Sequence, residues 1–330
     1  MNDRAVSVLS EYDFEVIRTW KGREAILFET PEGIRILKEY TGFTKKLALQ
    51  NALLACIREK GDVPVEEILP NKEGELWTKD QNQGNYIVKT YFSGRECSIR
   101  DGEECRNAVG VLARLHKAMI MPIQEAEEGL EDTIVRMDKE YEKHNRELKK
   151  VRRFLRDKSQ KNDFEIYLLK YYDGFMEKAF EVAERWNACQ KEDYYQQLAE
   201  KGIWCHGDFQ YHNLLLNKDD VCVINFEKCA CDSQVRDLYL FLRKLLEKNS
   251  WSLTLGNGIL ETYQKEKSLS KEELEQLYYR LAYPEKFWKI VNFYYNTGKS
   301  WIPGRNMEKF EKLLKQEKEK EQFLKTLLNC

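Results

Sequence analysis

The sequence predicts an α+β protein with two lobes, a small antiparallel β lobe with one main helix and a larger helical lobe. Between residues 16 and 92, apolar and polar residues roughly alternate, which is the period of half-buried strands. Beyond Gly94, apolar residues recur every three to four positions, as they do on helices. This change of period predicts an N-terminal lobe of residues 1–92 and a C-terminal lobe of residues 93–330. A cleft between two such lobes is a common ligand site.

The elements of the small lobe follow from strand and turn signals. Three short strands separated by turns are predicted to form an antiparallel meander: Val16–Trp20, Ala25–Glu29 and Ile34–Tyr40. Thr44–Lys60 is predicted as a helix, because its apolar residues have helical spacing and Gly61 follows as a stop. Later strands are expected at Val65–Leu69, Glu75–Thr78 and Tyr86–Phe92. The assembly we expect is a five-stranded sheet with one helix.

The larger lobe is predicted to be mainly helical. Apolar spacing marks a helix over Glu103–Met119, and residues 132–198 are helical in pattern almost throughout. Short apolar strands are expected within residues 204–226, and helices again from Asp237 onward.

Composition excludes several classes of protein. Lys and Arg number 54 against 56 Asp and Glu, so the net charge of −2 gives no general attraction to nucleic acid or to an anionic membrane. No apolar run approaches the roughly 20 residues of a membrane helix, and Met1 to Tyr12 lacks the layout of a signal peptide. The nine irregularly spaced cysteines are expected to be reduced, which predicts a protein that is cytoplasmic at synthesis.

One segment departs from this neutral balance. In Lys143–Lys161, nine Lys or Arg residues face only two acids, Glu147 and Asp157. The simpler interpretation is the solvated face of a long helix, and the alternative is a docking surface for an anionic partner.

The segment that carries chemistry is His206-Gly207-Asp208, with Asn213 five residues beyond the aspartate. A strand hairpin follows and ends at Ile224-Asn225-Phe226-Glu227. Phosphoryl transfer needs such groups: a carboxylate that accepts or orients the proton of the acceptor hydroxyl, and oxygen ligands for Mg²⁺ near the phosphates. The pattern therefore favours an ATP-dependent phosphotransferase.

These residues resemble the aminoglycoside phosphotransferase and choline kinase superfamily, whose catalytic loop has the same His-Gly-Asp form. Within it the chain is most similar to the CotS-type spore coat proteins. Three further segments carry that likeness: Trp204-Cys205-His206, Gln234–Tyr239 and Lys299–Pro303. The resemblance spans the whole chain and implies a bilobal protein-kinase-like fold, a helical insertion over about residues 117–203, and deposition in the spore coat.

The resemblance also implies roles for individual residues. Asp208 would be the catalytic group, and ATP and Mg²⁺ the cofactors. The implied metal ligands are Asn213, Asn225 and Glu227. The implied nucleotide contacts are Lys38, Lys21, Gly22, Thr90, Tyr91 and Phe92. The implied supporting residues are His206, Gln50 and Asp237. His116 is expected to be a packed histidine, and Trp288 and Trp301 to line the acceptor pocket; the role of His212 stays open.

Three departures from the superfamily pattern leave catalysis open. Asn225 stands where relatives carry a metal-binding aspartate, although Glu227 could supply the missing carboxylate. The helix after the third strand has no acid to position Lys38, so Gln50 is the expected polar substitute. The nucleotide-covering turn has one glycine, Gly22, and Trp20 could fill the cleft instead.

Two functions follow from these observations. The first is a phosphotransferase that acts on an alcohol group of a small molecule or coat component. The alternative is a catalytically inactive kinase-fold coat component or assembly scaffold. A nucleotide is the expected ligand, and the small-molecule or coat-protein partner stays unknown; neither nucleic acid nor a membrane is expected as a partner.

Overall fold

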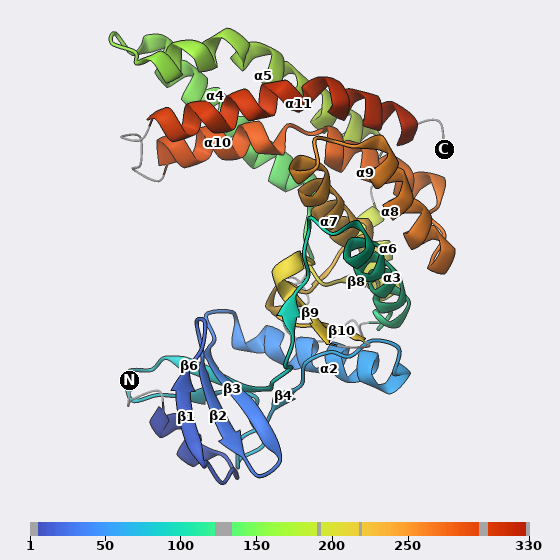
Figure 1. The fold of residues 1–330 in the computed structure, drawn as a ribbon. Coiled ribbons are helices and arrows are strands. Elements are labelled where there is room, and N and C mark those ends of the chain that lie inside the picture. The colour runs from blue at the N-terminus through green and yellow to red at the C-terminus, as the bar shows by residue number, and fades with distance from the viewer. Residues whose placement is uncertain (1–5, 123–133, 190–192, 218–219, 297–302, 328–330) are drawn as a thin grey trace. The chain divides into compact units, whose positions relative to one another are not determined.

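The computed structural model describes residues 6–122, 134–189, 193–217, 220–296 and 303–327 (Figure 1). The chain forms two compact units: unit 1 is Met1–Ile134 with Leu198–Asp237, and unit 2 is Val135–Gln197 with Leu238–Cys330. The α+β class is confirmed, since unit 1 carries an antiparallel sheet and the described elements of unit 2 are helices. The lobe boundary after residue 92 stays a prediction.

The main sheet of unit 1 has six strands that pair antiparallel in the order β1–β2–β3–β6–β4, with β5 also paired to β6. The strands are β1 (Arg18–Lys21), β2 (Ile26–Thr30), β3 (Gly33–Glu39), β4 (Ile68–Leu69), β5 (Thr78–Lys79) and β6 (Asn85–Thr90). The predicted meander is confirmed. The sheet has six strands where five were predicted, and β4 and β5 are only two residues long.

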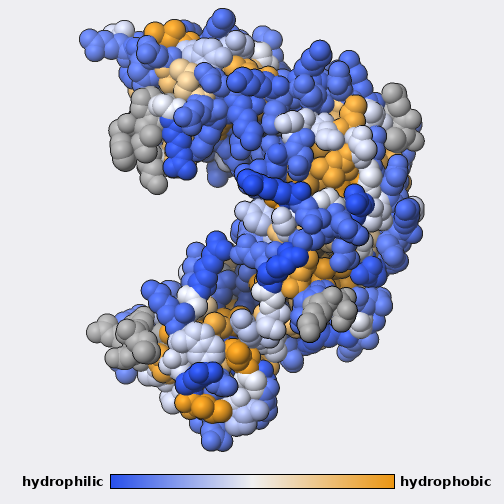
Figure 2. Space-filling model, viewed as in Figure 1, coloured by the Kyte–Doolittle hydropathy of each residue, from blue (hydrophilic) through white to orange (hydrophobic). Residues whose placement is uncertain are grey.

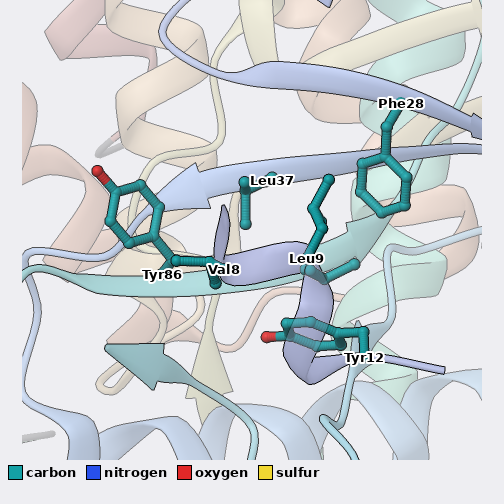
Figure 3. Close-up of a cluster of buried hydrophobic side chains, with 7 residues drawn as sticks. Val8, Leu9, Tyr12, Phe28, Leu37 and Tyr86 are labelled. Carbon is teal, nitrogen blue, oxygen red and sulfur yellow. The ribbon is translucent and has the colours of Figure 1, made fainter. Parts of the chain in front are cut away.

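A short N-terminal helix, η1 (Val8–Glu11), covers part of this sheet (Figure 3). Its apolar side chains join one buried cluster with residues of β2, β3 and β6: Val8, Leu9, Tyr12, Phe28, Leu37, Tyr86 and Val88. Full burial of a side chain of this size stabilises a fold by about 1.5–3 kcal/mol. The N-terminal segment is therefore part of the core of the β lobe, which the sequence analysis did not predict.

Helix α2 (Thr44–Lys60) has the bounds that the sequence predicts. Its buried face includes Leu47, Leu53, Leu54 and Ile57, which recur at helical spacing. The helix ends where the N–H of Gly61 donates to the carbonyls of Ile57 and Arg58. These contacts fix α2 as a packed element of unit 1.

The rest of unit 1 builds the loops that carry the site. The elements are β7 (Arg95–Glu96), α3 (Gly102–Ala118), β8 (Trp204–Cys205), η3 (Tyr211–Asn213), β9 (Leu214–Asn217), β10 (Asp220–Val223), η4 (Phe226–Lys228) and β11 (Ala230–Cys231). Strands β10, β9 and β7 form a small sheet, and β11 pairs with β8. A Cβ at Gly94 would lie 2.8 Å from the carbonyl oxygen of Leu216, so only glycine lets the chain before β7 approach β9 this closely.

Unit 2 packs long helices around an aromatic core, as the predicted helical pattern requires. The helices are α4 (Met137–Asp157), α5 (Asp163–Cys189), α6 (Tyr194–Glu200), α7 (Val235–Lys248), α8 (Leu253–Glu266), α9 (Lys271–Ala282), α10 (Glu285–Asn296) and α11 (Pro303–Leu327). Helices α6 and α7 each begin in one unit and end in the other. Helix α4 packs on α5 and α10, and α11 packs on α5, α9 and α10. Phe175 stacks on Phe287, with ring centroids 4.5 Å apart.

The basic segment 143–161 of unit 2 is ion-paired at some of its residues. Arg152 pairs with Asp173, and Lys158 pairs with Glu165 at 2.7 Å. Hydrophilic residues predominate on the face drawn in Figure 2. No helix among the described residues is long and apolar enough to span a bilayer.

Candidate functional site

The loop that starts at His206 is held in place by a buried carboxylate. Asp237, in the first turn of α7, accepts the backbone N–H groups of His206 at 2.6 Å and Gly207 at 2.8 Å. The ring Nε2 of His116 lies 3.2 Å from the same carboxylate. Burial would raise the pKa of Asp237, but the hydrogen bond and charge of His116, with the loop groups, lower it below its usual value. The carboxylate therefore stays ionised beneath the loop.

His206 and Gly207 set the direction of the loop. The backbone N–H of Asp208 donates to Nδ1 of His206 at 3.2 Å, and Nε2 of His206 donates to the carbonyl of Ile224 at 3.0 Å. Gly207 has φ 78°, and a Cβ there would lie 2.0 Å from the carbonyl oxygen of Lys228. The geometry of the loop thus requires glycine at position 207, and the ring of His206 ties the loop to Ile224. His206 has the bonding to loop backbone that the resemblance implies.

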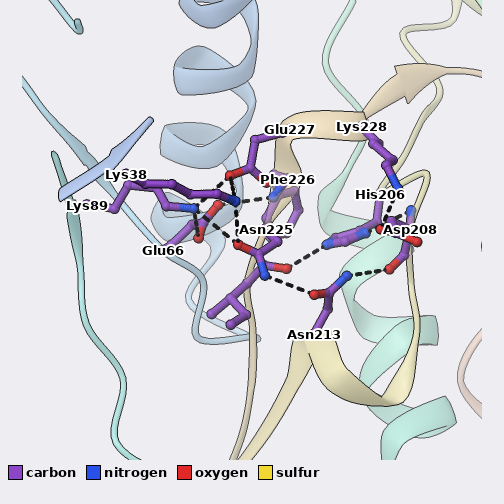
Figure 4. Close-up of polar contacts among 11 residues, drawn as sticks. Lys38, Glu66, Lys89, His206, Asp208, Asn213, Asn225, Phe226, Glu227 and Lys228 are labelled. Carbon is purple, nitrogen blue, oxygen red and sulfur yellow. Dashed lines mark hydrogen bonds and ion pairs between the residues drawn. The ribbon is translucent and has the colours of Figure 1, made fainter. Parts of the chain in front are cut away.

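Asp208 presents an ionised carboxylate. One oxygen accepts from Nζ of Lys228 at 2.8 Å (Figure 4). The other accepts from Nε2 of Gln210 at 2.6 Å. Burial would raise the pKa of Asp208, but the hydrogen bond and charge of Lys228 lower it on balance. At neutral pH this group is therefore available to accept a hydrogen bond from a hydroxyl or a water molecule.

Two lysine ammonium groups converge on one glutamate. Glu227 accepts from Nζ of Lys38 at 2.8 Å and from Nζ of Lys89 at 3.0 Å. Nζ of Lys89 also lies 2.8 Å from Glu66, whose other oxygen accepts the backbone N–H of Phe226 at 3.0 Å. Lys89 is 1% exposed and Lys38 is 29% exposed. We call Lys38, Glu66, Lys89 and Glu227 the lysine–glutamate cluster (Figure 4).

This cluster corrects one prediction and adds two residues. Gln50 is fully buried, and its amide atoms have no hydrogen-bond partner within the described ranges, so it does not position Lys38. Glu227 has that role instead. Lys89 and Glu66 were missed by the sequence analysis. The available signal was a lysine inside the apolar run Tyr86-Ile87-Val88-Lys89, on a strand with partners on both sides.

The charge on Glu227 predicts a pH dependence of stability. Burial would raise the pKa of Glu227, but the charges of Lys89 and Lys38 lower it from 4.5 to about 2. Because the pKa of the folded state is depressed, the stabilisation is present above about pH 4.5 and is lost as pH falls towards 2. We expect the free energy of unfolding to lose about 3 kcal/mol from this group over that window. Urea unfolding measures the free energy of unfolding at pH 6 and at pH 2.5. The drop between these two pH values should be smaller for Glu227→Gln than for the wild type. An equal drop in both proteins would contradict the role of Glu227.

The predicted metal ligands do not fit a divalent cation in this arrangement. Nδ2 of Asn225 donates to Oδ1 of Asn213 at 2.9 Å, and Oδ1 of Asn225 lies 3.5 Å and 3.4 Å from the ammonium groups of Lys38 and Lys89. Those ammonium groups also engage Glu227. The oxygens of Asn225 and Glu227 therefore already face ammonium groups, and Oδ1 of Asn213 accepts an amide N–H. Across the part of the chain that is described, no cluster of three or more His, Cys, Asp or Glu has metal-site geometry.

A cavity of about 590 Å³ in unit 1 brings the lysine and loop residues together. Lys38, Lys89, Asp208, Asn213, Asn225, Glu227 and Lys228 all line it. The turn between β1 and β2 contributes Arg23, Glu24 and Ala25. His212 also lines this space, and its role stays open.

Six residues named from the sequence are absent from the cavity lining: Trp20, Lys21, Gly22, Thr90, Tyr91 and Phe92. Because Trp20 does not line the cavity, it does not fill it. The guanidinium of Arg18 lies 5.3 Å from the centroid of its ring.

The predicted acceptor-pocket residues lie elsewhere or outside the described residues. Trp288 stacks on His144 at 3.5 Å and donates to Glu147 at 2.8 Å within unit 2. Lys299 to Ile302, with Trp301, lies outside the described residues. None of the eight described cysteines forms a disulfide bond.

Comparison with known proteins gives consistent results. Residues 6–327 match the family model described as "Spore coat putative kinase YutH". The chain is 23% identical over 328 residues to spore coat protein S of Bacillus subtilis (strain 168), covering 97% of this chain and 92% of that protein.

Two solved structures show the same fold. An aminoglycoside phosphotransferase from Alicyclobacillus acidocaldarius has a TM-score of 0.81 at 18% identity, over 98% of this chain and 94% of that one. The spectinomycin phosphotransferase APH(9)-Ia, solved with ADP and spectinomycin, has a TM-score of 0.62 at 13% identity, over 99% and 96%. The predicted protein-kinase-like fold is thereby confirmed.

Proposed function

Because the chain belongs to the spore coat YutH family of kinase-like proteins, we propose that it is a coat protein that binds a nucleoside di- or triphosphate in the unit 1 cavity. The observation that carries this proposal is the convergence of the Lys38 and Lys89 ammonium groups on that cavity. Solved neighbours support it: APH(9)-Ia is described with ADP, and the amicoumacin kinase hAmiN with AMP-PNP and Ca²⁺. We place its synthesis in the cytoplasm and its deposition in the coat.

The two ammonium groups suit the phosphates of such a ligand. Lys38 donates to Glu227 and Asn225, so one of its three donors is left for an anionic oxygen. Lys89 uses its donors on Glu66, Asn225 and Glu227 and contributes its charge. Arg23 on the β1–β2 turn lines the same cavity and takes the place proposed for Lys21 and Gly22. The backbone of Thr90 to Phe92 is kept as the proposed adenine contact. The backbone N–H of Thr90 already donates to the carbonyl oxygen of Glu67.

The donor set also indicates that binding does not depend on a divalent metal. Asn225 is neutral, and its oxygen faces the ammonium groups of Lys38 and Lys89, so the phosphates would meet ammonium groups of the protein at this position. The resemblance implies Mg²⁺ as a cofactor, but this arrangement of side chains does not favour Mg²⁺ binding.

A thermal-shift titration with ADP tests the proposal. We expect ADP to raise the Tm of the wild-type protein, with EDTA and with Mg²⁺ alike, because a ligand that binds the folded state stabilises it by mass action. Lys38→Met should reduce the shift at least threefold, and Lys201→Met, an exposed lysine of unit 1, should leave it unchanged. No shift for the wild type under either condition would exclude nucleotide binding.

A second candidate function, phosphoryl transfer, is favoured by the geometry of Asp208. Its ionised carboxylate faces the same cavity as the lysines and could take the proton of an acceptor hydroxyl. The acceptor oxygen would then bond to the terminal phosphorus of ATP, the bond to the bridging oxygen would break, and ADP would leave.

ATP hydrolysis, with water as the acceptor, separates the two candidates. If the protein turns over, Asp208→Ala should lower kcat about 10²–10⁴-fold, because a positioned base is lost. The control is Asp62→Ala, which removes an exposed carboxylate of unit 1. If the wild type releases phosphate and Asp208→Ala releases it equally fast, Asp208 does not have the proposed role. If the wild type releases no phosphate, the protein binds nucleotide without turning it over.

A further inference from the structure

Unit 2 contains a second cavity, of about 230 Å³, whose charged lining is mostly positive. Seven Lys or Arg residues and two Glu residues line it, a formal excess of five positive charges. They come from α7, from the start of α10 and from the middle of α11. We call this space the basic cavity. The whole chain carries a net charge of −2, so this is a local concentration of positive charge.

The two glutamates do not neutralise this charge. Glu247 is engaged by Arg243 at 3.1 Å and by Lys286 at 3.4 Å. Glu285 accepts from Lys289 at 3.0 Å and lies 3.6 Å from Nδ1 of His144. Both carboxylates therefore already have partners.

The remaining basic residues of the lining are Lys244, Lys248, Lys309, Lys312 and Lys320. Within the described segments of the chain, no carboxylate oxygen lies within ion-pair distance of any of them.

Lys320 is the most informative member of the basic cavity. It is 6% exposed, and its ammonium group has one long hydrogen bond, 3.4 Å to the carbonyl of Ala282. It also lies 5.6 Å from the centroid of the Trp251 ring. Burial, together with the charges of Lys178 and Arg243, lowers the pKa of Lys320 to about 8, although Glu317 and Glu247 act against the shift. A buried ammonium with two unused donors is costly unless an anion occupies the space beside it.

A solvated basic helix face does not account for this arrangement. Lysines on such a face extend their ammonium groups into water, as the exposed Lys315 and Lys318 of α11 can. Lys320 is turned into the protein, and Nε of the neighbouring Arg243 is buried and has no hydrogen-bond partner within the described ranges. Two inward-facing cationic groups with unused donors point to a ligand with several acceptor oxygens.

We propose that the basic cavity binds a small phosphate-bearing anion. A phosphate group offers a double negative charge and tetrahedrally arranged oxygens, which suit ammonium donors that approach from three helices. Ligand pockets for drug-sized molecules measure about 300–1,000 Å³, so this smaller space suits a phosphate or short polyphosphate group. The indole ring of Trp251 and the phenol ring of Tyr283 form its apolar wall. The proposal is independent of nucleotide binding in unit 1.

Isothermal titration calorimetry with inorganic tripolyphosphate tests the proposed phosphate binding. The parent protein is Lys38→Met, so that binding in the unit 1 cavity contributes little to the measured heat. Lys320→Met in that parent should weaken binding at least tenfold, since a charge-assisted hydrogen bond is lost. Lys315→Met, on the same helix but outside the cavity lining, should change it less than twofold. Lys320→Met loses no ion pair and should keep the parent Tm.

Lys244→Gln on α7 provides an independent variant if Lys320→Met does not fold, and should weaken binding about threefold or more. No binding by the parent, or equal losses for the Lys320 and Lys315 variants, would overturn the proposal. Citrate that binds as tightly as tripolyphosphate would overturn the assignment of phosphate as the ligand group.

Discussion

Lys89→Met should lower the free energy of unfolding by about 3–5 kcal/mol, because it leaves the buried carboxylate of Glu66 without its ion-pair partner. Glu66 is 2% exposed at its side chain and pairs with Lys89 at 2.8 Å, and Glu227 is the second carboxylate that Lys89 contacts. Lys89 also lies in the register between β3 and β4, opposite Ile36 and Ile68. Urea unfolding at pH 7 measures the loss.

Lys38→Met is the matched control for this substitution. Lys38 is 29% exposed and has one carboxylate partner, so we expect its loss to cost about 1 kcal/mol. The double variant Lys89→Met with Glu66→Gln should recover part of the loss, since no charged Glu66 is then left unpaired. Equal costs for the two single variants would show that Lys89 is not the buried centre of the cluster.

Asp237→Ala should be similarly destabilising, by about 3–5 kcal/mol. The substitution leaves the backbone N–H groups of His206 and Gly207 without the carboxylate that accepts them and removes one partner of His116. All of these groups are buried, so water does not replace the lost contacts. Thermal and urea unfolding followed by circular dichroism measure the change.

Two comparisons isolate the cause. Asp237→Asn keeps one acceptor oxygen and should cost less than Asp237→Ala. Asp62→Ala, an exposed carboxylate, should change the free energy of unfolding by less than about 0.5 kcal/mol. If Asp237→Ala proved as mild as Asp62→Ala, the carboxylate would not be what holds the loop.

Sequence patterns predicted the elements whose bounds depend on residues close together in the chain. The bounds of α2 followed from apolar spacing and the glycine stop, and the β1–β3 meander followed from alternation. The strand predicted at Val65–Leu69 was too long, because β4 pairs only through Ile68 and Leu69. The N–H of Glu67 donates to the hydroxyl of Thr90 instead of continuing the ladder. A pattern within one strand does not reveal where its partner ends.

The same limit applies to the site. Asp208 and Asn213 lie in one continuous motif, so the sequence could place them together. Gln50 was chosen because it is polar, but it shares the buried face of α2 with Leu47 and Leu54, three and four residues away. Lys89 and Glu66 belong to separate segments that meet only through the register of β4 with β6. The ion pair between Lys89 and Glu66 could therefore not be predicted from their spacing in the sequence.

A crystal structure of the protein grown with ADP and EDTA tests the central claim most directly. We expect the β-phosphate oxygens within hydrogen-bond distance of the ammonium group of Lys38, without a bound metal. ADP held elsewhere, or density for the nucleotide only after Mg²⁺ is added, would contradict it.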